Sequence, residues 1–287
     1  MPEGPEVATV QRQLSPLLNR NVVVAVKCYD RRFAELPPIG VRILRTWRHG
    51  KWLHWYFESG EVIRINLGMS GRFVVGNYVP KHQRWAMLVQ VGKQKRAIRY
   101  IDPRGFGHLQ RLSGTNAATV ADVKSLVDGL HSCNLGPDVL SYHFCNDQQN
   151  LAFNGWRIAM DSNVPIKQTL MNQSRIAGIG NIYACEICHE LGVHPELPAN
   201  CLTKQHLQRL VRVVPILLNS AIARGGTSFG DANTFRDIYG KEGQFSRYLK
   251  VYGKEGETCR CGGTINRLRL AGRSTFFCDN CQRMQPQ

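Results

Sequence analysis

Short runs of alternating hydrophobic and polar residues fill the chain from residue 21 to about residue 112. They are rich in Val, Ile, Trp, Tyr and Phe, and the breaks between them contain Gly, Pro, Asn or Lys. Alternation places the apolar side chains on one face of a strand, and several short strands at this spacing are typical of an antiparallel sandwich or barrel. The pattern predicts a β-rich first part, preceded by a helix-friendly stretch at residues 7–18.

The pattern becomes helical after residue 115. Residues 116–141 predict a helix that ends near the Gly-Pro pair at 136–137, because proline disfavours continuing a helix. Residues 163–195 predict two helices with a glycine-marked turn at 178–180, the second closing at Gly192.

Residues 203–226 predict one more helix, with a kink at Pro215. The glycine-rich stretch 227–257 follows, and it is long for a structureless connection, so part of it is expected to be a functional loop. The chain is thus expected to have an α+β multidomain fold. The expected domains are 1–130, 131–250 and 251–287.

The charge balance narrows the classes of partner. Among 287 residues, 37 Lys and Arg stand against 21 Asp and Glu, which gives a net charge of +16. Such an excess attracts polyanions, and nucleic acid is the first candidate. The alternatives are a basic enzyme without a nucleic-acid partner and a protein that binds anionic membranes.

No apolar run approaches the roughly 18 residues that span a membrane, and no signal peptide is recognised, so a cytoplasmic protein without a membrane partner is expected.

Four cysteines cluster near the C-terminus as Cys-x-Cys, sixteen residues, then Cys-x-x-Cys. They are Cys259, Cys261, Cys278 and Cys281. Two close pairs of thiolates joined by a hairpin-length segment can complete a tetrahedral zinc site. So small a segment has almost no hydrophobic core, so it needs a bound metal to stabilise its fold. Four unligated thiols are the alternative. The first pair is one residue shorter than the usual Cys-x-x-Cys, and the predicted role is structural because no position stays open for water.

The segment between the cysteine pairs predicts two strands around Ala271 and Gly272, with Arg273 at or next to the tip. A solvated arginine on a turn is one interpretation, and a phosphate contact is the other. The motif AGIGNIY offers backbone N–H groups and the amide of Asn181 to a phosphate, although it selects no function alone. CEICH, at residues 185–189, matches a haem-attachment pattern but is interpreted as core thiols at i and i+3 of a helix.

The chain opens with MPEGPEV, which has two interpretations. Proline is tolerated in the first turn of a helix, and the carboxylates of Glu3 and Glu6 favour the helix dipole. Alternatively, removal of Met1 gives Pro2 a secondary amine that can attack an electrophilic carbon. Its iminium has no N–H to lose, so it stays cationic and acts as an electron sink, and Glu3 can serve as general acid or base.

Several motifs occur in an order that indicates a family. They are MPEGPEV, RHGKW around Lys51, LGMSG at 67–71, DPRGFG at 102–107, AGIGNIY at 177–183, and GRSTFFC in the cysteine hairpin. Together they resemble the formamidopyrimidine-DNA glycosylase and endonuclease VIII family over nearly the whole chain. The resemblance implies an N-terminal antiparallel β-sandwich with a leading helix, a helix-two-turn-helix domain and a C-terminal zinc-finger β-hairpin with one structural Zn²⁺.

The resemblance also implies an activity. Family members remove oxidised bases from double-stranded DNA, act on abasic sites and nick the strand by β,δ-elimination, with DNA between the two main domains. Pro2 would be the nucleophile at C1′ of the extruded nucleotide, and Glu3 would assist sugar-ring opening and proton transfer. Glu6 would support the active-site end of the first helix. A monomer is expected, associated with the nucleoid if the source is bacterial.

Other positions of the motifs would bind DNA. Lys51, Asn181 and Arg273 would grip phosphates around the lesion, and Lys167 is a further candidate for a phosphate contact. Met69, Arg104 and Phe106 would fill the space that the extruded base leaves. The loop at 227–244 is expected to cover that base.

The choice of branch depends on a few positions. Gly4 is typical of the endonuclease VIII side, whereas LGMSG and DPRGFG are typical of the formamidopyrimidine side and supply Met69, Arg104 and Phe106. These three shape the DNA-facing surface, so an oxidised purine such as 8-oxoguanine or its ring-opened relative is the expected substrate. Endonuclease VIII-like action on oxidised pyrimidines, and a DNA-binding member that has lost catalysis, are the alternatives.

Overall fold

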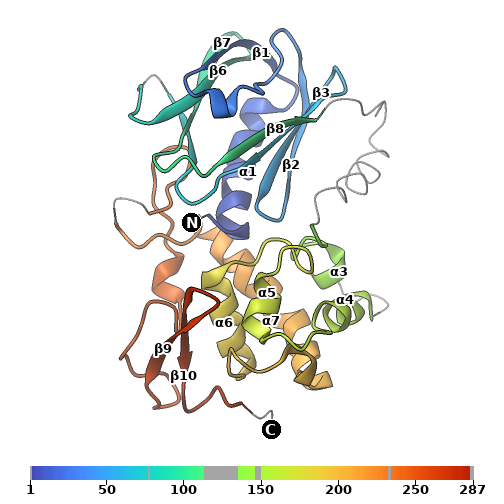
Figure 1. Ribbon diagram of the computed structural model, residues 1–287. Helices are drawn as coiled ribbons and strands as arrows, with labels where there is room; N and C mark the ends of the chain where they lie inside the picture. The colour runs from blue at the N-terminus through green and yellow to red at the C-terminus, as the bar shows by residue number, and fades with distance from the viewer. Residues whose placement is uncertain (1, 77, 113–134, 146–149, 232–233, 285–287) are drawn as a thin grey trace. The chain divides into compact units, whose positions relative to one another are not determined.

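The structure is a computed structural model that describes residues 2–76, 78–112, 135–145, 150–231 and 234–284 (Figure 1). It divides into two compact units. Unit 1 is the described part of residues 1–132 together with Ala221–Ser246, and unit 2 is the described part of Cys133–Ser220 and Arg247–Gln287. Most of the helix predicted at 116–141 lies outside the described residues. The predicted domain boundaries remain predictions.

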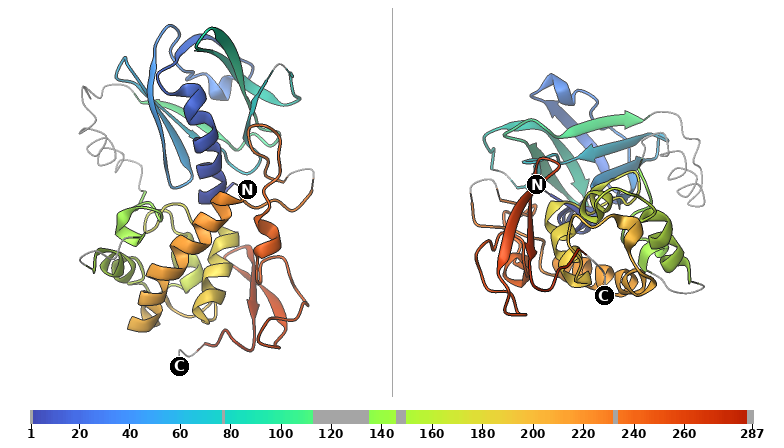
Figure 2. Two further views of the ribbon diagram at one scale, coloured as in Figure 1. Left: turned by 180° about the vertical axis from the view of Figure 1, so that it is seen from behind. Right: turned by 60° about the horizontal axis from the view of Figure 1, so that its bottom comes forward.

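Unit 1 begins with helix α1 (Gly4–Leu18). Proline in the first turn and a reciprocal capping box between Glu3 and Glu6 start the helix. The apolar residues recur at helical spacing and are fully buried along one face: Val7, Val10, Leu14 and Leu18. Figure 2 shows α1 running along the strands of unit 1, so this face packs against the sheet core.

Eight strands form two antiparallel sheets of four, as the alternating pattern predicts. The first sheet has the order β1 (Val22–Cys28), β6 (Gln83–Val91), β7 (Gln94–Ile101), β5 (Arg72–Val75). The second has the order β2 (Ile43–His49), β3 (Trp52–Phe57), β4 (Val62–Asn66), β8 (His108–Leu112). A short 3₁₀ helix, η1 (Arg31–Phe33), follows β1.

Aromatic side chains join the two sheets. The ring of Trp55, on β3, lies 5.9 Å from that of Trp85 on β6 and 5.6 Å from that of Phe73 on β5, measured between centroids. All three side chains are buried in one core cluster with the apolar face of α1. Burial of such large rings supplies much of the hydrophobic stabilisation, so the predicted β-sandwich with its leading helix is confirmed.

Unit 2 is mainly helical. Its described helices are α3 (Tyr142–Cys145), α4 (Leu151–Ala159), α5 (Ile166–Met171), α6 (Asn181–Leu191) and most of α7 (Lys204–Ala223), whose last turn belongs to unit 1. Unit 2 also contains the 3₁₀ turn η4 (Ala199–Cys201), and the 3₁₀ turn η5 (Phe245–Tyr248) begins in unit 1 and ends in unit 2. Helix α6 ends at Gly192, whose φ of 72° is the left-handed conformation that glycine adopts freely, as predicted. Helix α7 continues through Pro215.

The first of the two helices predicted at 163–195 is shorter than its pattern suggests. It ends at Met171, and two side chains of the following connection satisfy the backbone groups there. Asn172 Oδ1 accepts the N–H of Ser174, while Gln173 donates to the carbonyls of Met171 and Ile179. These local side-chain bonds compete with helix continuation.

The cysteine-bearing segment forms the predicted hairpin, β9 (Ile265–Leu270) with β10 (Arg273–Cys278). Ala271 and Gly272 make the turn, with φ values of 47° and 74°, as a two-residue turn between right-twisted strands requires. Arg273 is exposed and directly follows the tip. Within the described residues, no helix is both long enough and apolar enough to cross a bilayer.

Candidate functional site

The amino end of α1 carries two buried carboxylates beside Pro2. Glu6 Oε2 accepts the backbone N–H of Glu3 at 2.9 Å, and Glu6 Oε1 accepts the backbone N–H of Thr227 at 2.8 Å. Glu3 and Glu6 are each 1% exposed. Both oxygens of Glu6 are thus engaged with backbone, which fixes this carboxylate, and the carboxylate of Glu3, next to Pro2, accepts the backbone N–H of Glu6 in the capping box.

Gly226 permits that arrangement. Its φ is +89°, and a Cβ on it would lie 2.9 Å from Glu6 Cγ and 3.1 Å from the ring of Phe235. A larger residue would therefore be strained and would displace the Glu6 carboxylate. The close approach of residues 226–227 to α1 belongs to unit 1 and was not predicted from the sequence.

The loop at 227–244 is anchored at both ends. Thr227 and Gln244 form an antiparallel bridge, and Phe235 and Ile238 are buried in the core of unit 1. Gln13 of α1 donates to Asp237 at 2.8 Å. These contacts hold the described part of the loop beside α1, and its expected role in covering an extruded base stays a prediction.

Lys51 lies in the tight turn between β2 and β3. Gly50 in this turn has a φ of 58°, and its carbonyl accepts a hydrogen bond from Arg48 at 2.6 Å. The carbonyl of Lys51 accepts the side-chain amide of Asn66 at 3.4 Å. The backbone under Lys51 is therefore fixed, which suits a residue expected to contact a phosphate.

Met69, Arg104 and Phe106 lie on two neighbouring loops that the buried Asp102 joins. Ser70 Oγ donates to Asp102 Oδ1 at 2.6 Å, and the N–H of Gly107 donates to Asp102 Oδ2 at 2.7 Å. A Cβ on Gly68 would lie 2.4 Å from the carbonyl oxygen of Phe106, so this close approach requires glycine. The structure thereby brings the two motifs LGMSG and DPRGFG together.

The three side chains expected to fill the space left by the extruded base are exposed on these loops. Met69 and Phe106 are 42% and 51% exposed, and the guanidinium of Arg104 lies 5.1 Å from the ring centroid of Phe106. Exposed large apolar groups on an anchored loop are typical of a binding surface. Their placement suits the predicted role, which stays a prediction.

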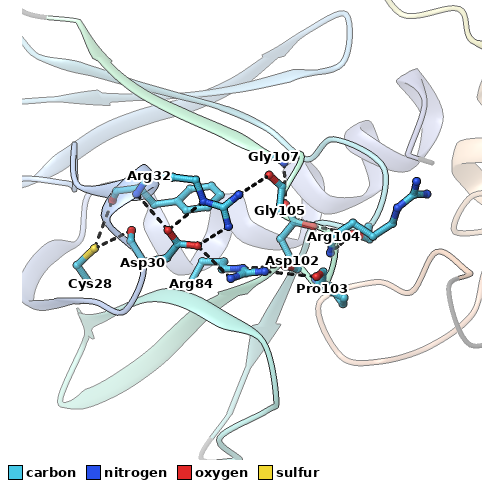
Figure 3. Close-up of polar contacts among 11 residues, drawn as sticks. Cys28, Asp30, Arg32, Arg84, Asp102, Pro103, Arg104, Gly105 and Gly107 are labelled. Carbon is cyan, nitrogen blue, oxygen red and sulfur yellow. Dashed lines mark hydrogen bonds and ion pairs between the residues drawn. The ribbon is translucent and has the colours of Figure 1, made fainter.

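An ionic network supports the loop that bears Arg104 (Figure 3). Arg84 donates to the carbonyls of Asp102 at 2.7 Å and Pro103 at 3.3 Å, and Arg32 donates to the carbonyl of Gly105 at 3.3 Å. Asp30 bonds both guanidinium groups, at 2.7 Å and 3.0 Å. Chiefly because of its bond to Arg32, the pKa of Asp30 is lowered to about 2.

Asp30, Arg32 and Arg84 were not identified from the sequence. An acidic residue next to two arginines gives no signal of its own, because charged surface residues are common. Arg84, the second partner of Asp30, lies 54 positions further along the chain, so only the fold reveals the network.

In unit 2, Asn181 and Lys167 both bind strand β10 next to Arg273. The amide of Asn181 donates to the carbonyl of Ser274 at 3.0 Å, and Lys167 Nζ donates to that carbonyl at 3.2 Å and to Thr275 Oγ1 at 2.6 Å. Lys167 is only 1% exposed. Its ammonium therefore holds the hairpin in place, and a direct phosphate contact by Lys167 stays a prediction.

A buried acid, Glu186 of α6, was also missed by the sequence reasoning. Its carboxylate accepts the backbone N–H groups of Lys250, Val251 and Tyr252 at 2.8–3.0 Å. Burial raises the pKa of Glu186, and the three hydrogen bonds oppose that rise. Glu186 therefore ties α6 to the segment that leads into the cysteine hairpin.

The four C-terminal cysteines form a compact cluster that could hold a metal ion. Their sulfur atoms all lie within 4.8 Å of one another, and Cys261 and Cys278 are 3.3 Å apart, Cys259 and Cys281 3.9 Å. The sulfur–sulfur edge of a tetrahedral zinc–thiolate site is about 3.8 Å, given Zn–S bonds near 2.3 Å. None of the described cysteines forms a disulfide, so the donor set fits zinc.

The other paired cysteines of unit 2 are buried. Cys185 and Cys188, in the CEICH stretch, are fully inaccessible on α6, and burial raises the pKa of Cys188. Both are core thiols, as predicted, rather than attachment points for haem.

Family models match three successive parts of the chain. They are the formamidopyrimidine-DNA glycosylase N-terminal domain at residues 1–109, the formamidopyrimidine-DNA glycosylase H2TH domain at 135–233, and the zinc finger found in FPG and IleRS at 256–283. Together they cover most of the chain, including the cysteine cluster.

Curated relatives match over the full length. The formamidopyrimidine-DNA glycosylase of Ruegeria pomeroyi is 34% identical over 99% of this chain and 100% of its own. That of Desulfitobacterium hafniense is 35% identical over 98% of this chain and 100% of its own.

Solved structures show the same fold. The MutM (Fpg) protein of Thermus thermophilus superposes with a TM-score of 0.80 at 33% identity, covering 98% of each chain. The Lactococcus lactis Fpg in complex with DNA containing an abasic site superposes with a TM-score of 0.80 at 27% identity, covering 98% of this chain and 99% of that one. The chain therefore belongs to the formamidopyrimidine-DNA glycosylase family.

Proposed function

We propose that the protein is a bifunctional DNA glycosylase and abasic-site lyase of base-excision repair that removes oxidised purines, such as 8-oxoguanine and formamidopyrimidines, from double-stranded DNA. Relatives matched over their whole length are formamidopyrimidine-DNA glycosylases, and Lactococcus lactis Fpg has been crystallised with abasic-site DNA and, as a mutant, with Fapy-dG DNA. A net charge of +16 suits a DNA partner. The observation that carries the proposal is the buried Pro2–Glu3 pair at the amino end of α1, held by Glu6.

Pro2 is the nucleophile once Met1 has been removed. Its nitrogen lone pair forms a bond to C1′ while the bond between C1′ and the damaged base breaks, and the base leaves with that electron pair and takes up a proton. The proline nitrogen then gives up its N–H proton, and its lone pair expels O4′, which Glu3 protonates as the sugar ring opens; this leaves a cationic iminium between Pro2 and C1′.

The iminium then draws electrons from the sugar. Loss of the C2′ proton expels the 3′ phosphate, and a second elimination expels the 5′ phosphate, which is the proposed β,δ-elimination. Because the proline iminium carries no N–H, it cannot be discharged by losing a proton from nitrogen. Loss of the C2′ proton turns it into a neutral enamine, and expulsion of the 3′ phosphate restores the cation. Hydrolysis finally returns the free amine of Pro2.

The exposed side chains of the two loops stabilise the extruded state of the nucleotide by filling the space that it leaves in the duplex. Phe106 acts as an aromatic wedge, Arg104 pairs with the orphaned base, and Met69 fills remaining space. Lys51, Asn181 and Arg273 hold phosphates, which positions the backbone without reading sequence. Asp102 and Arg84 support this surface through the loop backbone.

The cysteine cluster binds one structural Zn²⁺ in this proposal. Cys259, Cys261, Cys278 and Cys281 would hold it, and the bound metal supplies folding energy to a hairpin with almost no core of its own. No ligand position is left for water, so the zinc braces Arg273 and takes no part in bond cleavage. A cytoplasmic monomer is the expected state, associated with the nucleoid if the source is bacterial.

Gly4 favours a second candidate specificity, for oxidised pyrimidines, because this position resembles the endonuclease VIII side. A panel of duplexes with different lesions, scored for base release and strand scission, separates the two. Release of 8-oxoguanine and formamidopyrimidines ahead of oxidised pyrimidines supports the proposal, and the reverse order supports the second candidate.

Borohydride trapping tests the chemistry. The protein is mixed with a duplex carrying 8-oxoguanine opposite cytosine, and a covalent adduct is expected on reduction. Pro2→Gly should abolish the adduct, whereas Pro38→Gly, in a loop of unit 1, should retain it. Intact binding without any adduct in the wild type would favour a DNA-binding member that has lost catalysis.

A further inference from the structure

The imidazole of His189 lies against the cysteine cluster of unit 2. His189 Nε2 is 3.3 Å from Cys259 Sγ and 3.7 Å from Cys281 Sγ. The residue is near the end of α6, which packs against β10 (Figure 1). None of the motifs that identified the family includes His189, and the proposed chemistry does not use it.

The thiols of the cluster differ in the donors that reach them. Cys278 interacts with the backbone N–H groups of Asn280 and Cys281, within the turn of the Cys-x-x-Cys pair. Cys261 interacts with the backbone N–H of Gly263. The sulfur of Cys259 is instead contacted by the imidazole of His189, which is the polar group that reaches it from outside the cluster among the described residues. This cysteine begins the shortened Cys-x-Cys pair.

We propose that His189 donates an N–H···S hydrogen bond from Nε2 to the metal-bound thiolates of Cys259 and Cys281, and thereby slows the loss of zinc. The inference rests on the zinc site proposed above. A metal-bound thiolate has no proton and can only accept, and four of them around Zn²⁺ leave an excess of negative charge that donors stabilise.

The surroundings of the ring favour a donor over a metal ligand. Histidine ligands usually donate their second ring N–H to an oxygen, which leaves the other nitrogen unprotonated for the metal. His189 Nδ1 is buried and has no hydrogen-bond partner in the described part of the chain. Four sulfur atoms within 4.8 Å of one another already complete a tetrahedron.

Zinc release from the full-length protein tests the inference. The zinc-loaded wild type, His189→Phe and His189→Gln are each mixed with excess 4-(2-pyridylazo)resorcinol, which captures zinc and reports it by colour. Phenylalanine keeps a planar ring but has no N–H donor, so zinc release should be about tenfold faster. This is the lower end of the roughly 10- to 100-fold loss of metal affinity that follows removal of a hydrogen-bond partner of a metal ligand. Glutamine keeps an N–H donor and should release zinc close to the wild-type rate.

His206→Gln is the matched control. His206 Nδ1 accepts the N–H of Thr203 at the start of α7, and glutamine three residues after this threonine can make the same kind of cap. Its zinc release should equal that of the wild type. Equal release from His189→Phe and the wild type would overturn the inference while leaving the zinc site itself standing.

Cobalt substitution separates the donor from a ligand. The Co²⁺-loaded wild type and His189→Phe should both show the sulfur-to-metal absorption of a four-thiolate site. A change from a three-sulfur, one-nitrogen spectrum on substitution would show that His189 is a ligand and would overturn the inference. A wild type that binds neither metal would overturn the proposed zinc site, and this inference with it.

Discussion

The carboxylate of Glu6 binds the backbone N–H of Thr227, a residue 221 positions further along the chain, at 2.8 Å. Its second oxygen binds the backbone N–H of Glu3. One buried side chain therefore fixes both the start of α1, where Pro2 lies, and the start of the loop at 227–244. This coupling explains why a carboxylate at this position serves the proposed site without itself reacting.

Glu6→Gln should destabilise unit 1. A carboxamide presents an NH₂ group to one of two backbone donors, which loses a buried hydrogen bond and costs about 1–3 kcal/mol in the free energy of unfolding. Urea unfolding at neutral pH measures the change. Glu58→Gln, at an exposed surface ion pair, is the control and should leave stability nearly unchanged. An unaltered unfolding curve for Glu6→Gln would contradict the assigned contacts.

Asp102→Asn should loosen the surface formed by Met69, Arg104 and Phe106. The carbonyl oxygen of asparagine can accept the hydroxyl of Ser70, but its NH₂ group then faces the N–H of Gly107, and two donors cannot bond. The loop that carries Arg104 and Phe106 therefore loses the hydrogen bond at Gly107. We expect several-fold weaker binding of duplexes with 8-oxoguanine, measured by fluorescence anisotropy. Asp279→Asn, exposed on the zinc hairpin, should bind normally. Wild-type affinity for Asp102→Asn would show that the loops hold their shape without this carboxylate.

Asp30 should stabilise the protein except at strongly acidic pH. Its pKa in the folded state is lowered to about 2, chiefly by Arg32, whereas an unfolded aspartate has a pKa near about 3.9. The stabilisation is therefore present above about pH 4 and is lost as pH falls toward 2. Unfolding free energies of the wild type and Asp30→Asn should differ at pH 6, and the difference should be clearly smaller at pH 3. An equal difference at both values would contradict the lowered pKa.

Cys278→Ser should remove one proposed zinc ligand and weaken DNA binding, because the hairpin that carries Arg273 loses its staple. Zinc content by atomic emission and affinity for abasic-site duplex should fall together. Cys201→Ser, at an exposed cysteine outside the cluster, should change neither. Unchanged affinity in a zinc-free Cys278→Ser protein would show that the metal does not brace the DNA-binding hairpin.

Elements that depend on local pattern were predictable from the sequence. The alternating runs give two antiparallel sheets, Gly192 ends α6, and the turn of the cysteine hairpin lies at Ala271 and Gly272. Each depends on periodicity or on a backbone conformation that glycine favours. The end of α5 was missed because Asn172 and Gln173 satisfy the backbone with side chains, which periodicity does not register.

Candidate site residues were predictable through motifs, but their supports were not. Glu6 and Asp102 lie within recognised motifs, yet the bond from Glu6 to Thr227 depends on tertiary structure. Arg84 and His189 lie outside the motifs of the family resemblance, and their partners are distant in sequence. Long-range hydrogen bonds leave no periodic trace in a single sequence, so such residues are found only when the structure is known.

The most direct test of the central claim is peptide mapping of the borohydride-reduced protein–DNA adduct by mass spectrometry. We predict that the sugar remnant is attached to the nitrogen of Pro2, in an amino-terminal peptide that lacks Met1. A remnant on a lysine, or active protein that retains Met1, would contradict the account.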